Sequence, residues 1–126
     1  MMRPTVLLVD DDFAHLETLG SLLEEEGFTV RKAGSGAEAL TLLADDVPDL
    51  CIVDVMMPFV DGLAMLRRMR AAPRTAAVPV IMVTAVPLEK LPPIPGCAGM
   101  FAKPLRIDDL LACLRQVLAD RASPDR

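Results

Sequence analysis

Acidic residues follow two short apolar segments of the sequence. The run Asp10–Asp12 comes directly after Val6–Val9, and Asp54 follows Leu50–Val53. Both segments are typical of buried strands in a parallel sheet, whose carboxyl ends meet at one edge. Carboxylates brought together there would repel one another and resist burial, and a hard cation such as Mg²⁺ relieves both problems. The spacing therefore predicts a metal site with oxygen ligands.

A hydroxyl and an ammonium group follow two further apolar segments. Thr84 comes after Val80–Val83, and Lys103 comes after Met100–Ala102. A metal ion and a lysine can neutralise a phosphoryl group, a threonine can donate a hydrogen bond to it, and a carboxylate can attack it. Together with the acids, these residues indicate phosphoryl chemistry.

Each of these residues also has an ordinary explanation when it is taken alone. Asp10–Asp12 could cap a helix, Thr84 could simply end a strand, and Lys103 before Pro104 could belong to a turn. The joint pattern favours a site, because each residue closes a different strand of one alternating fold.

The elements that must position these residues follow from hydrophobic periodicity. Short apolar segments alternate with longer segments that carry apolar residues at helical spacing. We expect strands at Thr5–Val9, Phe28–Lys32, Leu50–Val53, Val80–Val83 and Met100–Ala102, and helices at Phe13–Glu26, from a Ser35 cap to about Ala44, at Gly62–Arg70 and at Ile107–Arg121. This alternation predicts an α/β fold with a doubly wound five-stranded parallel sheet and a ligand site at the carboxyl ends of its strands.

The segment between the fourth and fifth strands departs from the pattern. Four prolines lie between Thr84 and Met100, and proline both lacks an N–H donor and clashes within a helix. We expect a degenerate fourth helix, with at most one helical turn around residues 88–91.

Composition limits the classes of partner and the cellular location. The net charge of −5 argues against nucleic acid, which needs a basic face. Three cysteines at irregular spacing fit reduced thiols of a cytoplasmic protein, and the apolar run near the N-terminus is too short for a membrane span. We expect one domain over residues 1–122 and a disordered polar tail at 123–126.

Four sequence motifs resemble those of response-regulator receiver domains of two-component signalling. They read VLLVDDD, CIVDVMMPFVDG, VIMVTA and FAKPL, and the resemblance covers nearly the whole chain in order and approximate spacing. It implies the flavodoxin-like strand order 2-1-3-4-5. It also implies a single-domain protein similar to chemotaxis regulators.

The resemblance assigns roles to the acidic residues. Asp54 corresponds to the phosphoacceptor and Asp11 to the direct ligand of Mg²⁺ or Mn²⁺. Asp10 corresponds to a ligand acting through water, and an oxygen of Asp54 and the backbone carbonyl of Met56 would also bind the metal. Asp12 follows the acidic pair and is expected instead to be an acidic residue in the first turn of the first helix.

Further roles follow for the other strand ends. Thr84 corresponds to the hydroxyl that binds the phosphoryl group, and Lys103 to the lysine that pairs with it, with a cis peptide bond to Pro104 expected. The family's aromatic switch position holds Met100 here, while Phe101 should face the opposite side of the strand.

These assignments predict a phosphorylation switch without its own output domain. It would accept a phosphoryl group from a sensor histidine kinase or a histidine phosphotransfer protein and act on an unknown downstream protein. We expect no enzymatic activity beyond phosphoryl transfer to Asp54 and slow loss of that group. The loss should be slow because Met56 and Val86, at the two positions that flank the phosphoryl group in this family, cannot position an attacking water by hydrogen bonding. The alternative is an interaction module independent of phosphorylation. The only histidine, His15, is expected to be an exposed helix residue, and contact with the phosphodonor kinase is the alternative.

Overall fold

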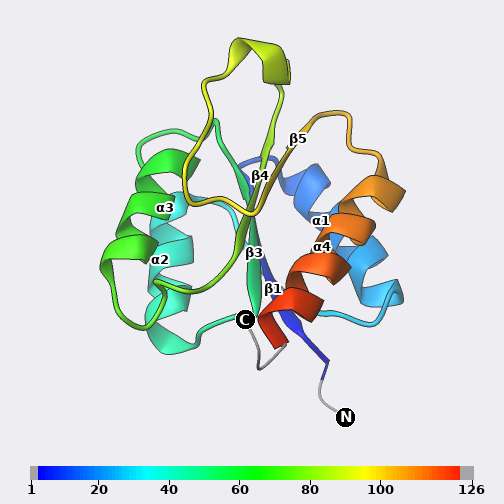
Figure 1. Cartoon of the computed structure of the whole chain (residues 1–126), viewed down its shortest axis with the longest axis horizontal. Coiled ribbons are helices and arrows are strands. Elements are labelled where there is room, and N and C mark those ends of the chain that lie inside the picture. Colours follow the sequence, from blue (N-terminus) through cyan, green and yellow to red (C-terminus); the bar gives the residue numbers. More distant parts are fainter. Residues whose placement is uncertain (1–2, 123–126) are drawn as a thin grey trace.

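The computed structural model describes residues 3–122, and the expected tail at 123–126 lies outside them (Figure 1). Within the described chain, strands and helices alternate as the periodicity predicts. The elements are β1 (Thr5–Val9), α1 (Phe13–Glu25), β2 (Thr29–Ala33), α2 (Gly36–Asp45), β3 (Leu50–Asp54), α3 (Gly62–Ala71), β4 (Val80–Thr84), the 3₁₀ turn η1 (Leu88–Lys90), β5 (Gly99–Ala102) and α4 (Ile107–Ala122). The label α4 thus belongs to the C-terminal helix. Each strand begins or ends within a residue of its expected position.

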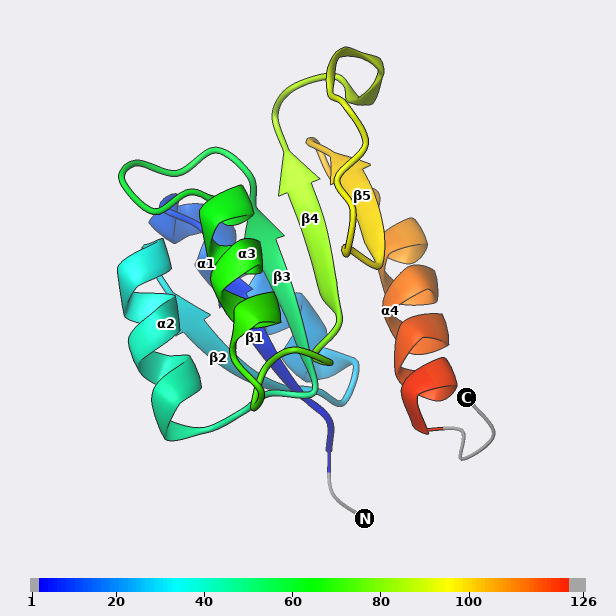
Figure 2. The same ribbon diagram turned by 60° about the vertical axis from the view of Figure 1, so that its left-hand side comes forward.

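The strands form one parallel sheet in the order β2-β1-β3-β4-β5, which confirms the expected topology. Helices α2 and α3 cover one face, and α1 and α4 cover the other (Figures 1 and 2). The register pairs Val9 with Val53, and Asp54 with Val83. The residues that follow β1, end β3 and β4, and follow β5 therefore meet at one edge of the sheet.

Side-chain caps fix where three helices begin. Ser35 accepts a hydrogen bond from the Glu38 N–H at 3.1 Å, and the Glu38 carboxylate accepts one from the Gly34 N–H at 3.1 Å. Asp12 caps α1 and Asp61 caps α3 in the same way. A cap supplies an acceptor for N–H groups that the helix itself leaves without a partner. Asp12 therefore caps α1 and lies one residue before the first turn in which we expected it, because its side chain accepts the His15 N–H.

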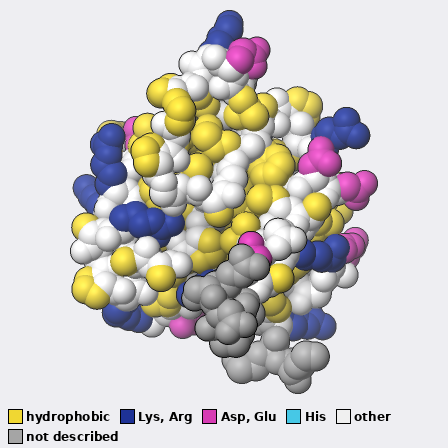
Figure 3. All heavy atoms as spheres, viewed as in Figure 1, with side chains coloured by type: hydrophobic (Ala, Val, Ile, Leu, Met, Phe, Trp, Pro, Cys, Tyr) yellow, Lys and Arg dark blue, Asp and Glu magenta, His cyan; other side chains and the backbone are white. Residues whose placement is uncertain are grey.

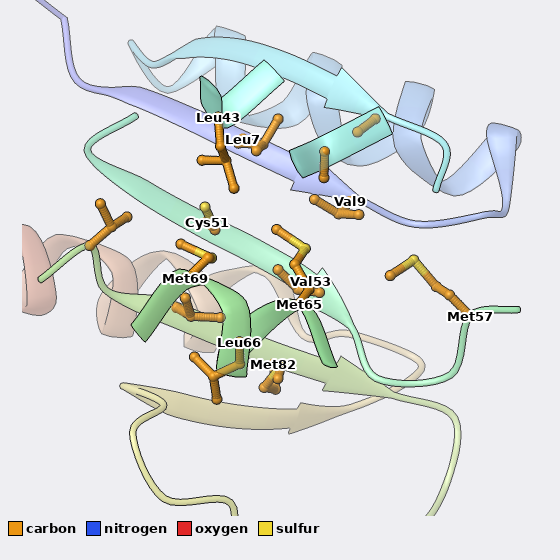
Figure 4. Close-up of a cluster of buried hydrophobic side chains, with 14 of the residues drawn as sticks. Leu7, Val9, Leu43, Cys51, Val53, Met57, Met65, Leu66, Met69 and Met82 are labelled. Atoms are coloured by element: carbon orange, nitrogen blue, oxygen red, sulfur yellow. The ribbon is translucent and has the colours of Figure 1, made fainter. Parts of the chain in front are cut away.

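The core lies on both faces of the sheet and is built from aliphatic and sulfur-containing side chains. On the face that α2 and α3 cover, Met65 and Met69 of α3 pack onto Cys51, Val53 and their neighbours (Figure 4). The opposite face is filled by leucines and isoleucines of α1, α4 and the strands. Strands β3 and β4 are buried at every residue, which explains their continuous apolar sequences. Burial raises the pKa of the Cys51 thiol to about 12, so this cysteine serves packing.

Gly62 lets α3 approach the end of β3 closely. A Cβ at this position would lie 2.7 Å from the carbonyl oxygen of Asp54 and 2.9 Å from the Cα of Val55. The Gly62 N–H donates to the Val55 carbonyl at 3.1 Å. The loop after Asp54 is thereby drawn back onto the strand, and a larger residue would displace the backbone that carries Asp54.

The segment between β4 and β5 contains only η1, which confirms the absence of a full fourth helix in the described chain. Figures 1 and 2 show η1 standing clear of the other helices. Arg70 of α3 connects the end of this segment to the rest of the domain. Its guanidinium donates to the carbonyl of Val78 at 2.7 Å and to that of Gly96, just before β5, at 2.8 Å. Figure 3 shows apolar side chains exposed on the side of the molecule seen in Figure 1. The segment 92–95 lines a groove together with Leu63 and Leu66.

Candidate functional site

The predicted acidic cluster forms at the carboxyl edge of the sheet. Asp10 follows β1 and is 3% exposed, Asp54 ends β3 and is 5% exposed, and Asp11 is exposed. One carboxylate oxygen from each of the three lies within 4.8 Å of the others. Oxygen ligands at this separation, on carboxylates that are partly shielded from water, suit a hard divalent cation. The donor set therefore fits the expected Mg²⁺ or Mn²⁺.

Lys103 joins the two buried carboxylates. Its Nζ atom donates to Asp10 Oδ2 at 3.0 Å and to Asp54 Oδ2 at 3.1 Å. The lysine follows β5 directly, and the peptide bond to Pro104 is cis, as expected. One ammonium thus holds together acids that come from two different strands.

The charges of Asp10 and Lys103 support each other. Burial alone would raise the pKa of Asp10, but hydrogen bonds from the Asp12 N–H, His15 and Lys103 outweigh it and lower that pKa. Burial alone would lower the pKa of Lys103, yet its hydrogen bonds to Asp10 and Asp54 raise it. Both groups are therefore held in their charged forms.

Asp54 has its pKa shifted upward, in the opposite direction from that of Asp10. Burial raises its pKa, and the neighbouring charge of Asp10 adds to the rise, against the opposing hydrogen bonds from the Met56 N–H and Lys103. The Met56 N–H donates to Asp54 Oδ1 at 3.0 Å and so fixes the carboxylate plane. A partly desolvated carboxylate next to cationic groups is a competent nucleophile toward an electrophilic phosphorus. The role of the Met56 carbonyl as a metal ligand stays a prediction.

Thr84 ends β4 with a completely buried side chain. It follows Val83, the register partner of Asp54, so the hydroxyl belongs to the same edge of the sheet. Its Oγ1 accepts a hydrogen bond from the Val86 N–H at 3.1 Å, and its carbonyl accepts one from the Lys103 N–H at 2.7 Å. The threonine therefore connects the site with the start of the segment that carries η1.

Met100, at the switch position of β5, and its neighbour Phe101 face opposite sides of the sheet, as expected. Met100 packs with the cluster under α2 and α3, whereas Phe101 packs with the cluster under α1 and α4. The only aromatic residue of β5 thus faces away from the segment between β4 and β5.

His15 was not expected at the site, and its interpretation as an exposed helix residue is wrong. Its side chain is 25% exposed, and Nδ1 lies 2.5 Å from Asp10 Oδ2. The sequence feature that could have indicated this position is the cap at Asp12. A helix that begins after Asp12 has His15 in its first turn, directly beside the acidic loop.

The parallel sheet and the polar residues at its carboxyl edge are those that the resemblance to receiver domains implied. A family model for the response regulator receiver domain matches residues 6–115. The chain therefore belongs to the response-regulator receiver family.

Sequence and structure comparisons agree with this assignment. The chain is 36% identical over 125 residues to the response regulator MprA of Mycobacterium sp. (strain KMS). This alignment covers 98% of this chain and 54% of the relative. It thus spans about half the length of the curated relatives it matches. Among solved structures, the Francisella response regulator 1452 receiver domain aligns with a TM-score of 0.84 at 29% identity, covering 94% of this chain and 99% of that one. The chemotaxis response regulator CheY4 of Vibrio cholerae aligns with a TM-score of 0.82 at 27% identity, covering 92% and 99%.

Receiver domains of this family are regulatory switches that histidine kinases phosphorylate. They typically bind Mg²⁺ at an acidic pocket, which the cluster of Asp10, Asp11 and Asp54 matches. Among residues 3–122, no helix is long and apolar enough to cross a membrane.

Proposed function

We propose that this domain is a phosphorylation switch that accepts a phosphoryl group on Asp54 with the help of Mg²⁺ or Mn²⁺. The donor would be a sensor histidine kinase or a histidine phosphotransfer protein. The observation that carries the proposal is the double contact of Lys103 with Asp10 and Asp54, beside three carboxylates that can share one cation.

The side chains divide the work of phosphoryl transfer among them. An oxygen of Asp54 attacks phosphorus, the O–P bond forms as the donor's N–P bond breaks, and the electron pair returns to the donor imidazole. Lys103 already contacts Asp54 Oδ2 and can follow the phosphoryl oxygens without a large movement. A cation held by Asp10 and Asp11 would neutralise the charge of the group being transferred.

Thr84 offers a route from the site to the surface. Its hydroxyl now accepts the Val86 N–H. A hydroxyl that turns to donate to a phosphoryl oxygen would release this N–H and loosen the start of the segment with η1. In this proposal, the segment without a fourth helix is the part of the surface that changes.

A phosphorylation-independent interaction module is the second candidate. The missing helix between β4 and β5 favours it, because that surface departs from the usual pattern. The acids, Thr84 and Lys103 favour the switch, since a module without phosphorylation would need none of them.

Metal-dependent labelling separates the two candidates. Incubation with acetyl phosphate and Mg²⁺ should add the mass of one phosphoryl group to the intact protein, because the cation offsets repulsion between the donor and the acidic cluster. The same incubation with EDTA in place of Mg²⁺ should leave the mass unchanged. A protein that stays unmodified under both conditions would support the interaction module.

The phosphodonor needs a docking surface next to Asp54, and an apolar groove begins beside Lys103. The groove runs between α1 and the start of α4 and is lined by His15, Thr18, Leu19, Leu22, Lys103, Pro104, Leu105 and Ile107. Leu22 is 37% exposed at this groove. We propose that it receives the surface of the donor that presents the phosphohistidine.

Replacing Leu22 with Arg should slow phosphoryl transfer from the cognate histidine donor by roughly tenfold or more, since a charge would enter an apolar contact. Transfer from acetyl phosphate should not change, because a small molecule needs no docking surface. Leu88→Arg is the matched control, since Leu88 is 40% exposed on η1, away from the groove. Equal slowing with both donors would show that the substitution damages the site itself.

We also propose that the domain acts on a downstream protein and is located in the cytoplasm. Three free cysteines support a cytoplasmic location, where thiols stay reduced. The expectation of a receiver without its own output domain stays a prediction, because the curated relatives are about twice as long as the stretch they share with this chain.

A further inference from the structure

His15 is fixed against the acidic loop by both its backbone and its side chain. Its N–H donates to Asp12 Oδ1 at 3.2 Å as part of the helix cap. Its Nδ1 lies 2.5 Å from Asp10 Oδ2. Because an ionised carboxylate can only accept, Nδ1 must be the nitrogen that carries the proton. The ring therefore donates a charge-assisted hydrogen bond to a carboxylate that is almost fully buried.

Hydrogen bonds occupy most of the acceptor positions of the Asp10 carboxylate. A carboxylate offers about four lone-pair directions. Oδ1 accepts the Asp12 N–H at 2.9 Å, while Oδ2 accepts both His15 and Lys103. Three donors thus fix the plane of the carboxylate, and the direction still open belongs to Oδ1. A cation, or water bound to it, would therefore meet Asp10 at Oδ1.

His15 is not placed to bind the cation itself. The described residues whose ligand atoms lie within 4.8 Å of one another at this edge are Asp10, Asp11 and Asp54, without His15. Any influence of the imidazole on the metal must pass through Asp10. Loss of the imidazole donor would leave Oδ2 with Lys103 alone, and the carboxylate could then turn toward the lysine and away from the metal.

We infer that His15 is a positioning residue of the metal site, which orients Asp10 for binding of the divalent cation. The inference rests on the proposed function, since it requires that Asp10 serve the metal. Hydrogen-bond partners of metal ligands typically contribute about tenfold to a hundredfold in metal affinity. Lys103 cannot replace this contribution, because it also contacts Asp54.

Titration calorimetry with MgCl₂ tests the inference without any phosphoryl donor. His15→Leu keeps a side chain of moderate size and removes the donor, so it should weaken Mg²⁺ binding by roughly tenfold or more. His15→Asn places an amide nitrogen where Nδ1 lies and should restore most of the affinity. Thermal unfolding without metal should show that all three proteins are folded. Labelling by acetyl phosphate should be slower for His15→Leu at low Mg²⁺ and should approach the wild-type rate when Mg²⁺ saturates.

The outcomes separate this inference from the function on which it rests. If the folded wild-type protein binds no Mg²⁺, the proposed metal site fails and the role of His15 fails with it. If the wild type binds Mg²⁺ and His15→Leu binds it equally well, only the role of His15 is overturned. If His15→Asn is as weak as His15→Leu, the imidazole acts through its shape, and the hydrogen-bond role is also overturned.

Discussion

Replacing Lys103 with Met should slow phosphorylation of Asp54 by roughly a hundredfold or more, while Mg²⁺ binds at least as tightly as in the wild type. The slower phosphorylation and the undiminished affinity for Mg²⁺ have one physical cause. The ammonium now contacts Asp10 and Asp54, so it stabilises a phosphoryl group on Asp54 but also competes with a cation for the same carboxylates. Methionine keeps the length of the side chain and removes its charge.

Two measurements on the same protein check this prediction. The rate comes from the intact mass during incubation with acetyl phosphate at saturating Mg²⁺, and the affinity comes from titration calorimetry. Lys90→Met is the control, because Lys90 is an exposed lysine of η1. If Lys103→Met is phosphorylated at the wild-type rate, or loses Mg²⁺ binding together with the rate, the account of this lysine is wrong.

Replacing Met56 with Asn and Val86 with Glu should speed loss of the phosphoryl group from Asp54 by roughly tenfold to a hundredfold. The Met56 N–H is bonded to Asp54 Oδ1, and the Val86 N–H is bonded to Thr84 Oγ1, so both side chains start next to the site. Neither a thioether nor an isopropyl group can hold and orient water, whereas an amide and a carboxylate can.

The decay is measured by intact mass after the phosphoryl donor has been removed and Mg²⁺ retained. Phe59→Asn serves as a control in the same loop, because the Phe59 side chain is fully exposed. A double variant that loses the group no faster than the wild type would show that these two side chains do not set the lifetime of the phosphorylated state.

The sheet and most of the site could be predicted because they depend on local patterns. Buried parallel strands need continuous apolar runs, and β3 and β4 show such runs up to Asp54 and Thr84. The polar residue at the end of each run then has to lie at one edge of the sheet. The four prolines after β4 act locally too, which explains why the missing helix could be predicted.

Contacts between distant elements could not be predicted in this way. The position of His15 against Asp10 depends on the angle at which α1 leaves its Asp12 cap. The bonds from Arg70 to the Val78 and Gly96 carbonyls depend on how three segments pack together. Phe59 adopts a φ of 64°, a left-handed conformation that aromatic residues rarely take, and its sequence context gives no sign of it.

The most direct test of the central claim compares three proteins after incubation with acetyl phosphate and Mg²⁺. Wild type should gain the mass of one phosphoryl group, and Asp54→Asn should gain none, because an amide is not a nucleophile toward phosphorus. Asp12→Asn is the matched control at the same edge of the sheet, since asparagine also caps helices well, and it should be labelled like the wild type. Labelling of Asp54→Asn to the wild-type extent would contradict the assignment of Asp54 as the phosphoacceptor.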